Sequence, residues 1–189
     1  DDRSTAIDVA CHEGYFSTLL AAHFATVTGI DKNADSIAKA SRIAGLLGHA
    51  NLRFVNASIE HWEQAADFVL CFGLLYHTEN PLQIFRKLAA LARKAICIET
   101  QVLPFEIAGA VEDGSYLAQR SLNGLFGLCA DYSQHQEGGL TDLALIPSRG
   151  AVEFLLRQFG FGRISFYRPD NDDYEQFVRN ARVIVYAEK

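Results

Sequence analysis

The chain has 189 residues, of which 49% are hydrophobic and 21% are charged, a composition that predicts one globular domain rather than a disordered chain or a coiled coil. Its net charge is −6 and no block of Lys and Arg occurs, which argues against binding to a nucleic-acid backbone. No apolar run approaches the roughly 20 residues of a membrane span. We therefore expect a cytoplasmic protein without a membrane partner, and the sequence leaves its oligomeric state open.

Apolar β-branched runs alternate with segments of helical periodicity through the first hundred residues, as is typical of parallel strands joined by crossover helices. The spacing predicts strands at 6–10, 26–30, 52–56, 68–72 and 95–100. Two helical faces are expected to pack on this sheet, one made of Phe16, Leu19, Leu20 and Phe24 and the other of Ile37, Ala40, Ala44 and Leu47.

Two further helices have clear boundaries. One begins at Pro81, where Asn80 can cap the helix and Gln83 completes a capping-box spacing. The other ends at Gly160, and strands are predicted after it at 163–167 and 182–187. The polar segment between these strands is too short for a crossover helix, so we expect an antiparallel pair. The predicted fold class is α/β, a Rossmann-like doubly wound and mostly parallel sheet of about seven strands.

The alternation of strands and helices fails over about 101–147, a stretch rich in Gly and aromatic residues. Because this is long for a connection, we expect an irregular insertion or lid inside a single domain that covers 1–189. The chain has no Met and starts at Asp1 directly before a strand, so we expect its native N-terminus to be missing. The cysteines form no CxxC pair, which predicts reduced, buried thiols and no metal site: Cys11, Cys71, Cys97 and Cys129.

The loops after the first two strands lie at the sheet edge where open α/β folds bind ligands. Gly14 stands at a helix entrance, where the absence of a Cβ lets a ligand approach the backbone. Ala10 and His12 replace two glycines of the GxGxxG dinucleotide fingerprint, which favours a ligand without phosphates. Asp31 ends the second strand, where a carboxylate can accept both ribose hydroxyls, although a simple turn cap is an equally good interpretation.

Three segments together resemble the class I S-adenosylmethionine-dependent methyltransferases. AIDVACHEGYF is similar to the first motif of that family, VTGIDKNADSI to its ribose-binding segment, and DFVLCFGLLYHTENP to the strand-four segment that meets the methionine end of the cofactor. LLYHTENP also resembles small-molecule methyltransferases and the tRNA wobble-uridine carboxymethyltransferases, and PSRGAVEFLLRQFGFGRI resembles the family's penultimate helix and strand. The resemblance implies S-adenosyl-L-methionine as the cofactor.

Carried over to this sequence, the resemblance implies a set of cofactor contacts. The methionine pocket is expected to be shaped by Asp8, Ala10 and Gly14, and the ribose to be held at Asp31 and Lys32. Near the adenine amino group, where the family often has an acidic residue, this chain has Ser58 with Ile59, and a hydroxyl can accept the same hydrogen bond. The cofactor's amino group and apolar wall are expected to meet Phe72, Gly73 and Leu74.

Two histidines are candidate general bases. His77 follows the strand-four loop and is the first choice, and His12 is the second, because a neutral imidazole suits proton abstraction from a hydroxyl or amine. For each histidine, a structural role in fixing the loop is the competing interpretation. Glu99 is expected either to touch the substrate or to pair with Arg120, and Tyr132 and His135 are candidates for an acceptor pocket, all three with packing or surface roles as the alternative.

The leading hypothesis is a methyltransferase acting on an oxygen or nitrogen of a small molecule. A tRNA-modifying (carboxy)methyltransferase is the alternative suggested by LLYHTENP and opposed by the acidic charge. A nicotinamide oxidoreductase is opposed by the missing phosphate glycines. A cofactor-binding protein without catalysis remains open because of Ala10 and His12.

Overall fold

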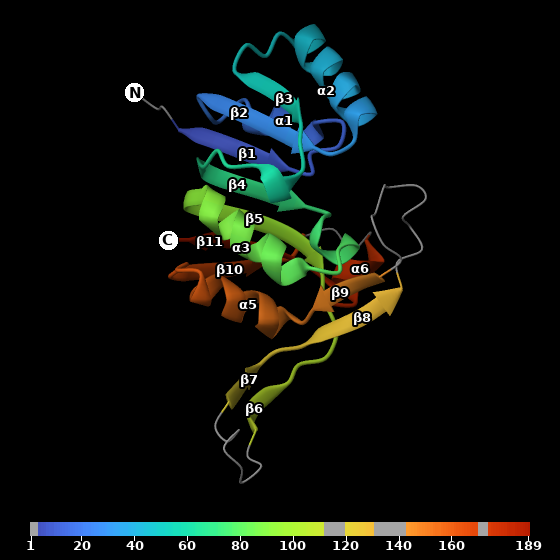
Figure 1. Cartoon of the computed structure of the whole chain (residues 1–189), viewed down its shortest axis with the longest axis vertical. Helices are drawn as coiled ribbons and strands as arrows, with labels where there is room; N and C mark the ends of the chain where they lie inside the picture. The colour runs from blue at the N-terminus through green and yellow to red at the C-terminus, as the bar shows by residue number, and fades with distance from the viewer. Residues whose placement is uncertain (1–3, 112–119, 131–142, 170–173) are drawn as a thin grey trace.

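The computed structural model describes residues 4–111, 120–130, 143–169 and 174–189. Its centre is a seven-stranded sheet with the order β10-β11-β5-β4-β1-β2-β3 (Figure 1). Strands β1 to β5 are parallel, whereas β11 is antiparallel to both β5 and β10. The predicted fold class is confirmed. The strands are β1 (Thr5–Val9), β2 (Thr26–Asp31), β3 (Leu52–Asn56), β4 (Ala66–Phe72), β5 (Ala92–Gln101), β10 (Arg163–Tyr167) and β11 (Arg182–Glu188).

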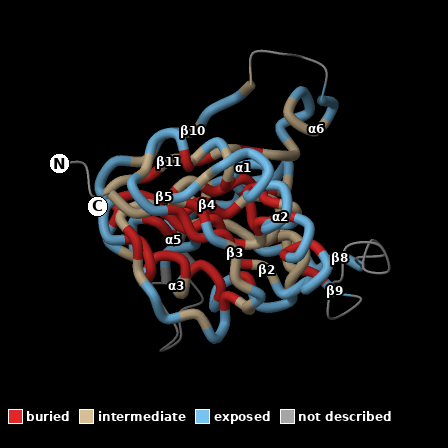
Figure 2. Tube along the Cα trace, turned by 90° about the horizontal axis from the view of Figure 1, so that it is seen from above, coloured by how far each residue is buried: buried red, intermediate tan, exposed pale blue. Residues whose placement is uncertain are grey.

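The helices cover both faces of this sheet. Successive side chains of a strand point to opposite faces, so Ile7 and Val9 join the larger core under the buried sides of α3 and α5. Ala6 joins a smaller core with Ala21 and Ala44 on the other face. Figure 2 shows the buried residues as a continuous layer through the middle of the molecule. The helices are α1 (Tyr15–Leu20), α2 (Ala34–Leu47), α3 (Pro81–Leu91), α5 (Arg149–Gln158) and α6 (Glu175–Val178), with 3-10 turns η1 (Ile59–His61) and η2 (Leu75–His77).

The expected apolar face of the first helix is wrong in part. Phe16 and Leu19 are 41% and 50% exposed, and the buried residue of α1 is Ser17. The reason is chemical, because the Ser17 hydroxyl donates a 2.6 Å hydrogen bond to the buried carboxylate of Asp8 and turns that side of the short helix inward. On α2 the predicted inner face is confirmed except at Leu47, which is exposed.

The stretch expected to be irregular contains two hairpins in its described parts. Strands β6 (Ala108–Val111) and β7 (Arg120–Asn123) pair with each other, as do β8 (Phe126–Ala130) and β9 (Leu143–Pro147). Figure 1 shows β6 and β7 projecting away from the central sheet. The expectation of an irregular segment is therefore wrong for these residues. These strands have only four or five residues, and β6 and β8 are interrupted by glycine, so too little period-2 pattern is present for them to be recognised in the sequence.

The two predicted helix boundaries are confirmed. Helix α3 begins at Pro81, although the Asn80 side chain makes no capping hydrogen bond. Helix α5 ends at Gln158, and Gly160 adopts a φ of 91° just beyond it. All four cysteines are free, and they are buried or half-buried. Within the described residues, no helix is long and apolar enough to cross a membrane.

Candidate functional site

A pocket of about 460 Å³ opens at the carboxyl ends of β1, β2 and β4, a volume within the range of small-molecule sites. It brings together ten of the sequence-predicted site residues: Ala10, His12, Asp31, Lys32, Ser58, Ile59, Phe72, Gly73, Leu74 and His77. Residues that the sequence did not single out complete the lining: Val9, Ile30, Ala57, Glu60, Tyr76, Thr78, Glu79, Asn80 and Ile84.

Two residues of the loop after β1 are not glycine but adopt the left-handed backbone conformation that glycine favours. Ala10 and His12 have φ values of 58° and 49°, in the left-handed region that normally favours glycine. Such residues cost roughly 1 kcal/mol or more each, so the surroundings must hold them in place. The Cys11 amide donates to the Ile30 carbonyl at 3.0 Å and the Gly14 amide to the Cys11 carbonyl at 2.8 Å. His12 is exposed, so its imidazole does not crowd the interior.

Asp31 is fixed by two backbone amides. Its Oδ2 accepts a hydrogen bond from the His12 amide at 2.9 Å, and its Oδ1 accepts one from the Asn33 amide at 2.8 Å. The first of these bonds ties the loop after β1 to the end of β2. A carboxylate has about four acceptor sites, so Asp31 can accept further hydrogen bonds from a ligand in the pocket.

Asp8 and Gly14 do not line the pocket. Asp8 is buried beneath the loop, where burial raises the pKa of its carboxyl group to about 7. A Cβ on Gly14 would lie 2.4 Å from Cζ of Phe54, so the space that glycine leaves is filled by a phenyl ring of β3 rather than open to a ligand. Both residues support the loop from below, and a direct contact with the cofactor stays a prediction.

The turn after β3 carries a carboxylate that sequence reasoning missed. Ser58 caps η1, and its Oγ accepts a hydrogen bond from the Glu60 amide at 3.4 Å. Glu60 lines the pocket together with Ser58 and Ile59. The resemblance placed Ser58 where the family often has an acidic residue, and the 3-10 turn brings an acidic side chain to the pocket two residues later. The family's acidic position at Ser58 could have drawn attention to Glu60. The sequence does not predict the 3-10 turn that brings Glu60 to the pocket.

The segment after β4 forms the opposite side of the pocket. Phe72 is followed by Gly73, whose φ of 78° turns the chain into η2. In η2, the rings of Tyr76 and His77 lie 4.4 Å apart between centroids, and both residues line the pocket. His77 and Thr78 are both half-buried, and both line the pocket. The sequence identified His77 and missed Tyr76, which reads as an ordinary aromatic residue of an apolar run.

In the structure Glu99 pairs with Arg182, a partner not expected from the sequence, and a pairing with Arg120 stays a prediction. Glu99 Oε1 accepts from Arg182 Nη1 at 2.6 Å, and Glu99 is buried behind the pocket rather than in its lining. Burial raises the pKa of the Glu99 carboxyl group, and Arg182 offsets part of this rise. Tyr132 and His135 lie outside the described residues. Among the residues that are described, no cluster of His, Cys, Asp and Glu could hold a metal ion.

Comparison with known sequences identifies the family. A model described as a methyltransferase domain matches residues 1–137, well over half of the chain. The chain therefore belongs to the methyltransferase-domain family, and the resemblance to S-adenosylmethionine-dependent methyltransferases is confirmed.

Curated relatives match over part of their length. The chain is 32% identical over 91 residues to a ubiquinone biosynthesis O-methyltransferase from Vibrio parahaemolyticus, which covers 46% of this chain and 38% of that protein. It is 27% identical over 118 residues to a tRNA U34 carboxymethyltransferase from Trichodesmium erythraeum, which covers 59% of this chain and 36% of that protein. The chain thus spans less than half the length of these relatives.

Solved structures agree with the fold. The N-terminal domain of EvdMO1 with SAH bound aligns with a TM-score of 0.73 at 18% identity, covering 98% of this chain and 74% of that one. Magnesium protoporphyrin IX methyltransferase (ChlM) from Synechocystis PCC 6803 with bound SAM aligns with a TM-score of 0.63 at 17% identity, covering 98% and 70%. At these identities the likeness extends to the fold and no further.

Proposed function

We propose that this chain binds S-adenosylmethionine in the pocket at the carboxyl ends of β1, β2 and β4 and transfers its methyl group to an oxygen or nitrogen of a small molecule. The observation that carries this proposal is that two carboxylates, Asp31 and Glu60, line the same pocket as the glycine turn at Gly73. Carboxylates can accept hydrogen bonds from ribose hydroxyls and from an adenine amino group.

The pocket suits a nucleoside without phosphates. A dinucleotide needs its pyrophosphate at a helix N-terminus and a close glycine backbone. Here the lining stops at His12 and includes neither Gly14 nor α1, which is only six residues long. The space where a side chain at Gly14 would stand is filled by the Phe54 ring. The nicotinamide oxidoreductase hypothesis is therefore disfavoured by packing as well as by sequence.

In this proposal the residues of the pocket orient the cofactor and the acceptor and form no covalent bond with either. When bound, the cofactor supplies a methyl group on a positively charged sulfur. Asp31 is fixed by two amides, which keeps its carboxylate oriented for the ribose, and Ile59 and Leu74 provide apolar contact. Alignment of donor and acceptor accounts for a large part of such a reaction rate. His77 lines the other end of the pocket, where it would accept the proton of a hydroxyl or amine.

A substitution at Asp31 tests cofactor binding. Asp31→Ala should weaken binding of S-adenosylmethionine by about 10- to 100-fold, because hydrogen bonds to charged groups contribute roughly 1.5 to 3 kcal/mol. Isothermal titration calorimetry measures the dissociation constant. Asp35→Ala is the matched control, since Asp35 is an exposed carboxylate in the first turn of α2 that does not line the pocket. Equal affinities of the two variants would contradict the assignment of this pocket.

Two of the curated relatives suggest different classes of methyl acceptor. The similarity to a ubiquinone biosynthesis O-methyltransferase favours a small molecule with a hydroxyl acceptor, and the similarity to a tRNA U34 carboxymethyltransferase favours tRNA. We prefer the small molecule because a net charge of −6 opposes phosphate contacts.

Release of S-adenosylhomocysteine with a panel of catechols and phenols, compared with tRNA, separates the candidates. Turnover with a phenolic acceptor supports the proposal. Filter retention and modification of tRNA at low salt would replace it with the RNA function. A protein that binds the cofactor but turns over neither class fits the non-catalytic alternative.

A further inference from the structure

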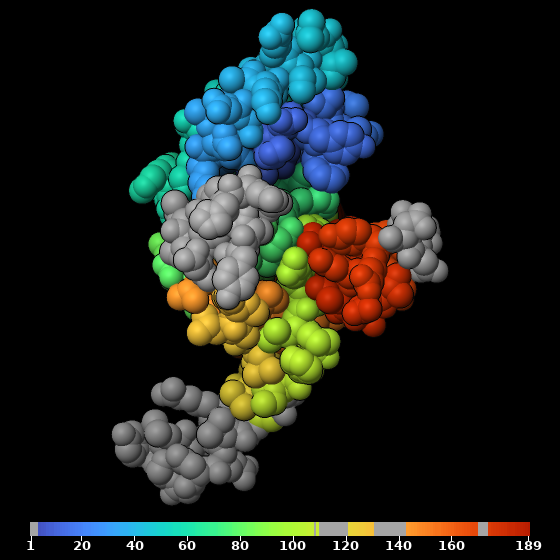
Figure 3. Space-filling model, turned by 90° about the vertical axis from the view of Figure 1, so that its right-hand side faces the viewer, coloured from blue at the N-terminus to red at the C-terminus, as the bar shows by residue number. Residues whose placement is uncertain are grey.

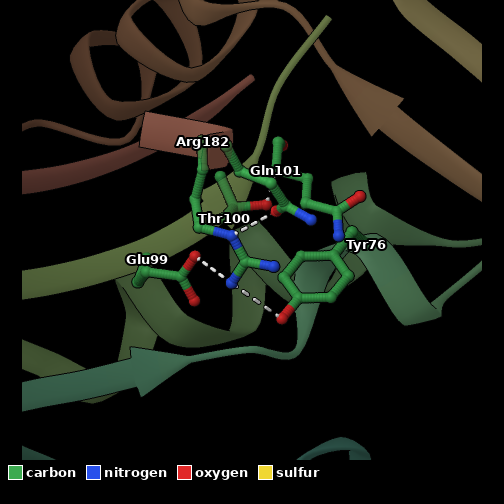
Figure 4. A network of polar contacts seen from close by, with 6 residues as sticks. Tyr76, Glu99, Thr100, Gln101 and Arg182 are labelled. Atoms are coloured by element: carbon green, nitrogen blue, oxygen red, sulfur yellow. Dashed lines mark hydrogen bonds and ion pairs between the residues drawn. The ribbon is translucent and has the colours of Figure 1, made fainter. Parts of the chain in front are cut away.

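A buried ion pair stands directly behind the pocket wall. Glu99 lies near the end of β5, and Arg182 is the first residue of β11, the neighbouring antiparallel strand. Their side chains are only 10% and 12% exposed, and Arg182 Nη1 donates to Glu99 Oε1 at 2.6 Å (Figure 4). A charge pair removed from water in this way needs further hydrogen bonds to be tolerated, so what else the guanidinium contacts is informative.

Arg182 also contacts Tyr76 in two ways. Its Nη1 donates to the Tyr76 hydroxyl at 3.1 Å, and its Cζ lies 4.8 Å from the centroid of the Tyr76 ring. On the other side, Nε donates to Oε1 of Gln176 at 2.7 Å, and the guanidinium lies 5.4 Å from the Tyr174 ring. The guanidinium is therefore held by β5 and by the segment around α6 while it holds Tyr76. Figure 3 shows the C-terminal segment that includes α6, in red, on the surface beside the green part of the chain.

Tyr76 is the member of this network that reaches the pocket. It lines the pocket within η2, and its hydroxyl lies 3.4 Å from the place where a Cβ on Gly73 would stand. The Gly73 amide in turn donates to the Glu99 carbonyl at 3.4 Å. The tyrosine hydroxyl thus lies over the glycine turn at the end of β4, the place assigned to the methionine end of the cofactor.

We propose that Arg182 is a positioning residue that fixes Tyr76 over Gly73, so that β11, which lies beyond β5 from β4, sets the shape of the pocket at the methionine end of the cofactor. The inference rests on the proposed function, since it concerns how the same pocket holds its ligand. Glu99 balances the charge of Arg182 without entering the pocket.

The geometry requires an arginine. A guanidinium presents several donors in a planar fork and can stack on an aromatic ring. Here the fork contacts a carboxylate, a hydroxyl and an amide oxygen while its Cζ lies over the rings of Tyr76 and Tyr174. The compact ammonium of a lysine could balance Glu99 but could not keep all of these contacts.

A double-mutant cycle read by calorimetric binding of S-adenosylhomocysteine tests this proposal. Tyr76→Phe and Arg182→Gln remove the same hydrogen bond, so each should weaken binding by about tenfold. Because they act through one interaction, the double variant should also lose about tenfold rather than about hundredfold. Arg182→Lys should resemble Arg182→Gln in affinity while it unfolds near the wild-type temperature, because the charge of Glu99 remains balanced. If Arg182→Gln does not fold, the cycle is run with Arg182→Lys.

Arg163→Gln is the matched control, since Arg163 of β10 is 84% exposed and pairs with Glu188 at the surface. It should bind like the wild type. Losses at Tyr76 and Arg182 that multiply, or an unchanged affinity after Arg182→Gln or Arg182→Lys, would overturn the positioning role. A wild-type chain that does not bind S-adenosylhomocysteine would instead overturn the proposed function, and this inference with it.

Discussion

Ala10 and His12 show how a motif can lose its glycines and keep its backbone. Both residues adopt the left-handed φ values that glycine favours, and the His12 amide donates a hydrogen bond to Asp31. The sequence alone left open whether His12 would crowd the pocket. The structure places His12 exposed at the pocket edge, and binding of the cofactor beside Ala10 and His12 stays a prediction.

Asp8 predicts a specific pH dependence of stability. Its pKa is raised by burial to about 7 from 3.8, so between these values the folded chain binds a proton that the unfolded chain does not. Stability contributed by this group is therefore complete below pH ~4 and is lost as the pH rises toward 7. Between pH 5 and 8 the wild type should lose about 2 kcal/mol more unfolding free energy than Asp8→Asn.

Urea unfolding at the two pH values measures this difference. Asparagine keeps an oxygen that can accept the Ser17 hydroxyl and does not titrate, so the variant isolates the proton. Parallel pH profiles for wild type and variant would show that Asp8 is ionised throughout the range.

At the scale of elements, the short helix α1 is fitted to the sheet through Gly14 at its entrance and through Leu20, which packs against the smaller core. The Phe54 ring of β3 fills the space next to Gly14 and also next to Gly29 of β2. The sequence predicted an apolar inner face for this helix and could not predict that Ser17 is turned inward by a buried carboxylate. By contrast, α2 and α3 are longer and have a clear 3.6-residue period, and there the predicted face or start is found.

Alanine substitutions at two left-handed glycines can separate the cost of overpacking from the cost of backbone strain. Gly14 and Gly48 have φ values of 82° and 74°, but a Cβ meets Phe54 at 2.4 Å at the first and nothing within 4 Å at the second. Gly48→Ala should cost about 1 kcal/mol of unfolding free energy from the left-handed conformation alone. Gly14→Ala should cost about 2 kcal/mol more because it overpacks the Phe54 contact.

Urea unfolding of both variants checks this difference, and a Phe54→Leu background should remove most of the excess at Gly14. The packing account is wrong if the two alanine variants lose equal stability, or if Phe54→Leu leaves the excess unchanged.

For the whole molecule, the parallel half of the sheet and the location of the pocket could be predicted because strand ends, rather than particular side chains, determine where ligands bind. Ten predicted residues line one pocket as a result. The contributions of Glu60 and Tyr76 could not be predicted, since each reaches the pocket through a 3-10 turn that has no periodic signal. The pairing of Glu99 with Arg182 could not be predicted either, because β5 and β11 are far apart in the sequence and become neighbours only in the folded sheet.

Comparative titration with S-adenosylhomocysteine and NAD tests the central claim most directly. The pocket has carboxylates for a nucleoside, and its lining stops at His12 before the helix entrance. Binding of S-adenosylhomocysteine should therefore release heat, with a dissociation constant in the micromolar range and a binding free energy of about −8 kcal/mol. Titration with NAD should release no heat. Binding of NAD, or no heat with S-adenosylhomocysteine even at millimolar concentration, would contradict the assignment of this pocket to a methyl donor.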